Sequence, residues 1–229
     1  MTTQPLRGLR LLAVIAVSTL LLAACSAGSP GASASAGGDD LPAGWERVEV
    51  SDEGFSIALP NDWDELSAED LGESGIFDEL ESANPEAADV LAQAQQAIES
   101  GQIALFAFDG EPDDPDSTFA ANVNVISAGE VDGTAQEAAD EMAEGIRAQV
   151  PVNGEVEAET VTLPAGDAGV VRYEWSISGG DGSSTDVSVT QYAVLADGDG
   201  YILSFSAATD TMTEYGPLFE QLAETFAVG

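Results

Sequence analysis

The segment Gly54-Phe55-Ser56-Ile57-Ala58-Leu59-Pro60-Asn61-Asp62-Trp63 contains the strongest structural pattern in this 229-residue chain. Apolar and polar side chains alternate through residues 55–59, as they do through 45–50, and the turn-forming residues 51–54 separate the two runs. This arrangement predicts a β-hairpin. Pro60 is expected to end the second strand because proline has no backbone N–H to donate. We expect Trp63 to fold back over the edge of the sheet and pack in the core.

Further strand patterns follow the hairpin. They occupy residues 103–108, 122–127, 155–163, 168–178, 185–196 and 200–207. Residues 179–184 and the sequence Asp197-Gly198-Asp199-Gly200 are expected to form turns between the last of these strands.

Helix patterns lie between and after these strands. Ser67 with Asp70 resembles the start of a short helix, and Asn84 followed by Pro85 predicts the start of a longer one. Thr134 and Glu137 have the spacing of a capping box. The last helix is expected to bury an apolar stripe made of Tyr215, Leu218, Phe219, Leu222 and Phe226. This order of elements predicts an α+β fold in which helices flank an antiparallel sheet.

The N-terminal segment has the features of an export signal. Arg7 and Arg10 precede an apolar stretch that ends in Leu22-Ala23-Ala24-Cys25, where Cys25 is the only cysteine of the chain. A basic start, a short apolar stretch and small residues at its end are typical of a cleaved secretory signal peptide. Leu22, Ala23, Ala24 and Cys25 together match a bacterial lipobox.

The lipobox predicts that residues 1–24 are removed and that Cys25 becomes a lipidated N-terminus. The thiolate of cysteine is the nucleophile that accepts a diacylglyceryl group, and further acylation, for example by palmitate, gives stable anchoring. The predicted location is therefore the extracytoplasmic face of the cell membrane. The alternative is a buried free cysteine behind an ordinary cleaved signal.

Composition divides the remaining chain into a tether and one domain. Residues 26–38 consist of Ser, Ala, Gly and one Pro, which bury too little apolar area to fold, so residues 25–43 are expected to form a lipidated, flexible linker. Residues 44–229 contain aromatic and aliphatic side chains at regular intervals and have the size of a single domain.

The chain is strongly acidic. It contains 42 Asp and Glu, five Arg, and neither Lys nor His, which gives a formal net charge of −37. Such a charge repels nucleic acid and anionic headgroups, so no nucleic-acid partner is expected and an electrostatic partner should be cationic. The alternative is a general acidic bias spread over a solvated surface.

Residue types needed for common catalytic chemistry are missing from the sequence. Without His and Lys, the chain cannot form a Ser-His-Asp or Cys-His pair, a phosphate-binding lysine site or a Schiff base. Chemistry based on two carboxylates, as in glycoside hydrolysis, is still available, but no pair of acids stands out. We therefore predict that the protein is not an enzyme.

One acidic loop is a candidate calcium site. It contains the carboxylates of Asp109, Glu111, Asp113, Asp114 and Asp116. An EF-hand loop requires glycine at position six and glutamate at position twelve, where this chain has Asp114 and Ala120. No cofactor is therefore expected, and weak calcium binding is the alternative.

The three tryptophans are the other candidate site residues. Large aromatic side chains usually pack in a core, and this is the expected role of Trp45, Trp63 and Trp175. The functional alternative is that one of them lines a ligand groove.

The Gly54–Trp63 segment is similar to the G-F-S-I-x-x-P-x-x-W opening of PsbP-like domains and of the actinobacterial lipoproteins called LpqN. The similarity extends over most of residues 44–229 and includes the strand patterns 169–175 and 200–205 and the final helix. It implies an α/β/α sandwich around an antiparallel sheet, used for binding and scaffolding. Metal sites that contain histidine cannot be transferred, because this chain has none.

These observations lead to one functional expectation. The chain should be a lipid-anchored, non-enzymatic binding or accessory module of the bacterial cell envelope, whose partner is an envelope protein or a small hydrophobic ligand. A calcium-dependent structural module and a carboxylate-based hydrolase of envelope sugars are the alternatives.

Overall fold

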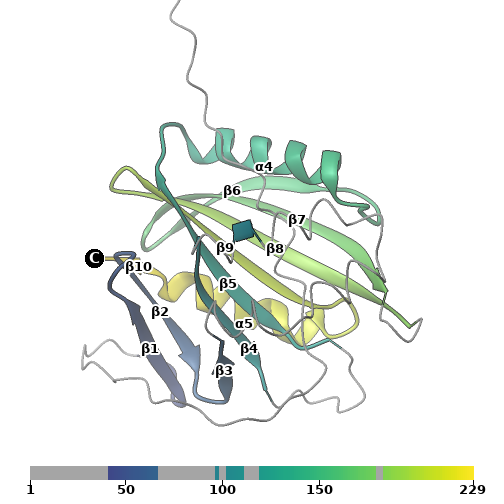
Figure 1. The fold of residues 1–229 in the computed structure, drawn as a ribbon, viewed down its shortest axis with the longest axis horizontal. Coiled ribbons are helices and arrows are strands. Elements are labelled where there is room, and N and C mark those ends of the chain that lie inside the picture. Colours follow the sequence, from purple (N-terminus) through teal and green to yellow (C-terminus); the bar gives the residue numbers. More distant parts are fainter. Residues whose placement is uncertain (1–40, 67–95, 98–101, 111–118, 179–182) are drawn as a thin grey trace, which may run out of the picture.

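The computed structural model describes residues 41–66, 96–97, 102–110, 119–178 and 183–229 (Figure 1). Most of its strands belong to one antiparallel sheet. These are β3 (Trp63–Glu65), β4 (Ile103–Asp109), β5 (Asn122–Glu130), β6 (Glu157–Leu163), β7 (Gly166–Ser178), β8 (Ser184–Ala196) and β9 (Asp199–Ala208). Within the described residues the strand order is β3-β4-β5-β9-β8-β7-β6, so β5, β9 and β8 form the centre.

The predicted hairpin forms a second, small sheet. Its strands are β1 (Trp45–Val50) and β2 (Phe55–Pro60), which pair from Trp45 opposite Pro60 to Val50 opposite Phe55. A two-residue strand at the C-terminus, β10 (Ala227–Val228), completes this sheet beside β2. The hairpin and the end of strand β2 at Pro60 are confirmed.

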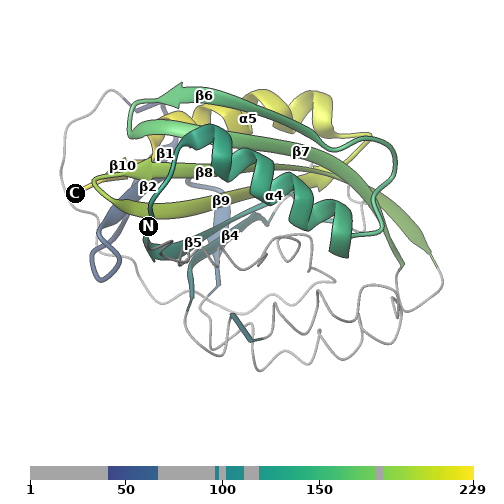
Figure 2. The same ribbon diagram turned by 90° about the horizontal axis from the view of Figure 1, so that it is seen from above.

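Two helices lie on opposite faces of the large sheet (Figure 2). Helix α4 (Ala135–Gln149) packs on β6, β7 and β8, and helix α5 (Met212–Thr225) packs on β9 and on β2. The α4 core includes Ala139, Met142, Ile146, Val171, Trp175 and Val189. The α5 core includes Ile57, Leu203, Phe205, Phe219, Leu222 and Phe226. The α+β fold with helices on both sides of an antiparallel sheet is therefore confirmed.

Neighbouring residues of one strand contribute to different cores because successive side chains of a strand point to opposite faces. Val170 belongs to the α5 core and Val171 to the α4 core, and both are fully buried. Central strands such as β9 are therefore buried along almost their whole length, as expected for a sheet that is covered on both faces.

Local sequence explains where α4 begins and how β8 turns into β9. The Thr134 side chain accepts a hydrogen bond from the backbone N–H of Glu137 at 3.2 Å, and the Glu137 carboxylate accepts from the backbone N–H of Thr134 at 3.0 Å. This confirms the capping box. Asp197 and Gly198 both have positive φ, as a two-residue hairpin turn of type I′ requires.

Close approach of α4 to the sheet depends on small residues. A Cβ atom added to Gly169 in β7 would lie 2.4 Å from the backbone oxygen of Ala135 and 2.7 Å from the backbone nitrogen of Ala139. Glycine at this position, together with the alanine-rich face of α4, lets helix and strand backbones touch.

Two predicted helices cannot be compared with the structure, and two observed strands were not predicted. The helices predicted to begin at Ser67 and Asn84 fall on residues outside the described part of the chain. Strands β3 and β10 were not predicted. In the described ranges, no helix has both the length and the apolar character needed to cross a bilayer.

Candidate binding site beside strand β6

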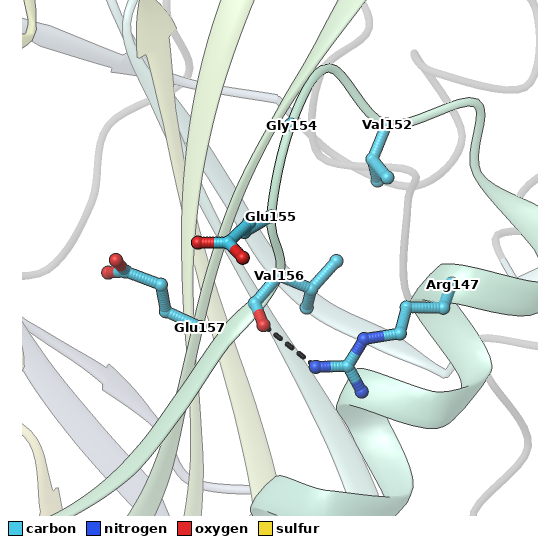
Figure 3. Close-up of a pocket in the computed structure, with 6 residues that line it drawn as sticks. All are labelled: Arg147, Val152, Gly154, Glu155, Val156 and Glu157. Atoms are coloured by element: carbon cyan, nitrogen blue, oxygen red, sulfur yellow. Dashed lines mark hydrogen bonds between the residues drawn. The ribbon is translucent and has the colours of Figure 1, made fainter.

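Two adjoining pockets open where the chain leaves α4 and enters β6. The first has a volume of about 410 Å³ and is lined by Arg147, Val152, Gly154, Glu155, Val156 and Glu157 (Figure 3). The second, of about 450 Å³, shares Gly154, Glu155 and Glu157 and continues along β7 and β8 to Arg172, Glu174 and Thr190. Because they share these three residues, we describe the two pockets together and call them the β6 site.

Arg147 is placed in the β6 site by the last turn of α4. A cation at a helix C-terminus is favourable because the exposed carbonyl groups there carry partial negative charge. Its Nη2 donates a hydrogen bond to the backbone oxygen of Val156 at 2.7 Å, which orients the guanidinium (Figure 3). The carboxylates of Glu155 and Glu157 point away from it (Figure 3). The guanidinium therefore keeps N–H donors for a group that enters the pocket.

Arg172 provides the second positive charge of the β6 site. It lies on β7 opposite Glu157 of β6 and forms an ion pair with Glu159. Burial of the guanidinium lowers the pKa of Arg172, but the hydrogen bond and charge of Glu159 outweigh burial and raise this pKa above its ordinary value. Arg172 is thus a permanent cation whose position is fixed by Glu159.

Side-chain hydrogen bonds hold the loop before β6 against strands β7 and β8. Asn153 donates to the hydroxyl of Ser176 at 2.7 Å, and this hydroxyl donates to Asp186 at 2.5 Å. Nearby, Ser188 donates to Glu174 at 3.2 Å. Backbone pairing adds to this, because the N–H of Asn153 donates to the carbonyl of Glu174 at 2.6 Å. The loop before β6 is therefore tied to β7 and β8.

The β6 site offers binding groups of both charge signs. Two of the five arginines of the chain stand beside exposed glutamates in an otherwise acidic protein. Such a site favours a polar partner that presents hydrogen-bond acceptors to the guanidinium groups and donors to the carboxylates. Its volume is within the range of small-molecule sites, roughly 300–1,000 Å³.

The three tryptophans are dispersed. Trp175 is buried in the α4 core, whereas Trp63 is buried in the α5 core and Trp45 packs against that core half-buried. None of the three lines either described pocket. The core-packing role expected for Trp63 at the sheet edge is confirmed, since it begins β3 and is 9% exposed.

The remaining predicted site residues are only partly described. Asp109 ends β4 and accepts a hydrogen bond from the Tyr215 hydroxyl at 2.6 Å. The other candidate calcium ligands, Glu111, Asp113, Asp114 and Asp116, lie outside the described residues, as do Leu22, Ala23, Ala24 and Cys25. No group of three or more potential metal-ligating side chains occurs within the ranges that the structure describes.

Sequence reasoning did not identify the β6 site. The sequence signal that was present is the scarcity of positive charge: Arg147 and Arg172 are two of only three arginines that follow Cys25. Arg147 is brought to the site by the packing of α4 and Arg172 by the antiparallel pairing of β6 with β7, which a linear pattern does not reveal.

Comparison with known proteins assigns neither a family nor a function. No family model matches the chain, and no curated protein matches it. Among solved structures it is similar to PsbP (CyanoP) from Synechocystis, at 15% identity over 85% of this chain and 98% of that one, with a TM-score of 0.46. It is also similar to LpqN from Mycobacterium tuberculosis, at 14% identity over 80% and 90% of the two chains, with a TM-score of 0.45. It is similar as well to the Ran-binding protein Mog1p from Saccharomyces cerevisiae, at 12% identity over 80% of this chain and 95% of that one, with a TM-score of 0.46.

Proposed function

We propose that the protein is a lipid-anchored, non-enzymatic binding module on the extracytoplasmic face of a bacterial cell membrane. The observation that carries this proposal is the sequence Leu22-Ala23-Ala24-Cys25 behind a basic and apolar leader, with Cys25 as the only cysteine. Acyl chains on this residue hold the protein at the membrane, since each buried methylene contributes about 0.8 kcal/mol.

The tether and the domain fit this arrangement. From their composition we expect residues 26–43 to behave as a flexible coil with a root-mean-square span of roughly 20–25 Å. The folded domain that begins near Gly44 then stands clear of the headgroups. Its negative charge adds repulsion from anionic lipids, so the lipid chains and not the domain surface provide attachment.

The β6 site is the surface through which we propose that the domain binds its partner. Guanidinium groups recognise carboxylate and carbonyl oxygens well, and a peptide segment or polar small molecule of the envelope presents such groups. Among the described residues, the pockets contain hydroxyl, carboxylate and guanidinium groups. The partner is accordingly a polar one, and the role is binding rather than catalysis.

Two variants test the two parts of the proposal separately. The full chain, expressed in a bacterium that processes lipoproteins, should be recovered with the membranes. A Cys25→Ser form exported with an ordinary cleavable signal peptide in place of residues 1–24 should be released into the soluble extracytoplasmic fraction. Equal distribution of the two forms would contradict the lipid anchor.

For the binding part, proteins cross-linked to the anchored chain in intact cells are compared for the wild type, Arg147→Gln and the charge-matched control Arg47→Gln. Arg47 lies outside both pockets and donates to Ser56 and to the carbonyl of Thr225. Loss of a charge-assisted hydrogen bond should weaken binding about tenfold or more in Arg147→Gln alone. Equal capture by all three forms, with equal thermal stability, would rule out the β6 site as the contact.

A further inference from the structure

A block of polar side chains lies buried in the middle of the large sheet. It consists of Asn122, Asn124, Gln191, Ser204 and Ser206, each at most 1% exposed. They come from the three central strands β5, β9 and β8, which are adjacent in the sheet (Figure 1). Fully buried asparagine and glutamine are uncommon, and a group of them in one place requires an explanation.

The strand register brings these side chains together. Asn122 is paired with Ser206 and Asn124 with Ser204 across β5 and β9, and Ser204 is paired with Gln191 across β9 and β8. Directly paired side chains on one face lie about 4.5–5.5 Å apart at Cβ. The five residues alternate with apolar neighbours of the α5 core, such as Val123 and Phe205, so all five face the side of the sheet that carries α4.

Aromatic and aliphatic side chains border this polar block. Phe106 and Phe108 of β4 are paired with Asn124 and Asn122, and Val171 and Tyr173 of β7 lie in the same two rows on the opposite side. Helix α4 packs mainly on β6, β7 and β8, so it covers the neighbouring part of this face. The five polar side chains are therefore bordered on both sides by apolar and aromatic side chains on this face of the sheet.

Hydrogen bonding within the block is incomplete. The Gln191 amide donates to the Ser204 hydroxyl at 2.9 Å, and the Asn122 amide donates to the carbonyl of Ala120 at 3.1 Å. Within the described part of the chain, both polar atoms of Asn124, Oδ1 of Asn122 and Oγ of Ser206 have no hydrogen-bond partner. Leaving a buried donor or acceptor unsatisfied costs roughly 1–3 kcal/mol, so several such groups side by side would be a large penalty in an empty interior.

We propose that this block is an interior binding site for a small neutral molecule that presents hydroxyl groups. The block contains amides and hydroxyls and no charged side chain, so it is suited to a ligand that both donates and accepts hydrogen bonds without carrying charge. Ordered water and the hydroxyl group of an organic compound share this chemistry. The aromatic border of Phe106, Phe108 and Tyr173 also suits an organic hydroxyl compound. This site is separate from the β6 site.

The experiment is a crystal structure of the full-length protein, purified from membranes, at a resolution that shows bound water. Density within hydrogen-bond distance of Asn124 and Ser206 is expected. Native mass spectrometry of the same preparation separates the two sources, because an organic ligand adds a defined mass that is lost on denaturation and water does not. A block without density, or one whose polar atoms all pair with protein groups, would overturn the proposal.

Serine variants provide a matched second measurement. Ser204 and Ser206 lie on the same strand and are both fully buried, but only Ser204 has a described partner within the block. With a bound hydroxyl ligand, Ser206→Ala and Ser204→Ala should each lower the melting temperature by roughly 2–6 °C. With an empty block, Ser206→Ala should leave the melting temperature unchanged or raise it, while Ser204→Ala still lowers it. That split would contradict the proposal.

Discussion

Replacing Gly169 with alanine should loosen helix α4 from the sheet. The added Cβ would lie 2.4 Å from the backbone oxygen of Ala135, 2.7 Å from the backbone nitrogen of Ala139 and 3.0 Å from its Cβ. Ordinary carbon–oxygen contacts are about 3.3–3.6 Å, so the helix must move outward by roughly 1 Å. Backbone atoms cannot rotate away as the end of a side chain does, and the shift is passed on to the whole α4 core.

The magnitude follows from two opposing effects. Overpacking of this kind costs typically about 1–3 kcal/mol, and the reduced freedom of the unfolded chain returns roughly 0.4–1 kcal/mol. A net loss of about 1–2 kcal/mol should lower the melting temperature by roughly 2–8 °C. Urea denaturation followed by circular dichroism measures the free energy of unfolding directly.

Gly200→Ala is the control for this prediction. A Cβ at Gly200 in β9 would lie 2.8 and 2.9 Å from the two methyl groups of the partly exposed Val131. Val131 lies outside the helices and strands and can shift more easily than the α4 backbone, so Gly200→Ala should cost clearly less than Gly169→Ala. If Gly169→Ala is as stable as the wild type, or if the two variants lose equal free energy of unfolding, then direct contact between the α4 and β7 backbones does not limit the residue at position 169.

Three further predictions concern other parts of the domain. Thr134→Ala removes the hydrogen bond to the N–H of Glu137 and should reduce the free energy of unfolding by about 1 kcal/mol, as measured by urea denaturation; an unchanged value would show that the capping box contributes nothing. Burial raises the pKa of the Tyr173 hydroxyl, so above about pH 10 the unfolded state loses a proton that the folded state retains, and stability should fall as pH rises. Tyr173→Phe should weaken this pH dependence between pH 9 and 11. Part of it should persist, because burial also raises the pKa of Tyr192 and Tyr201. An identical slope in the variant and the wild type would contradict a contribution from Tyr173. The net charge of −37 should make the melting temperature rise with added NaCl until repulsion is screened, whereas a flat response would mean that the acids lie too far apart to interact.

Local sequence patterns predicted the elements that depend on neighbouring residues. The hairpin around Gly54, the turn at Asp197-Gly198 and the capping box of Thr134 are each determined by a few adjacent residues, and all three are confirmed. The two-residue strand β10 and the three-residue strand β3 are too short to show a period. They exist because they pair with β2 and β4, which are distant in the sequence.

The polar interior shows a second limit of sequence patterns. Asn122-Val123-Asn124-Val125 has the alternation of a strand with one face in water, yet all four side chains are buried. Only the register of β5 with β9 reveals that Asn122 and Asn124 meet two serines inside the protein. The β6 site was missed for the same reason, because Arg147 reaches it only through the packing of α4 and Arg172 only through the pairing of β7 with β6.

Lipid attachment at Cys25 can be tested most directly by intact-mass measurement of the full-length gene product purified from bacterial membranes. The mass should equal that of residues 25–229 plus a diacylglyceryl group and any N-acyl chain, and fragmentation should locate the added mass on Cys25. A chain that retains residues 1–24, or one that begins at residue 25 without added lipid, would contradict the proposed anchor.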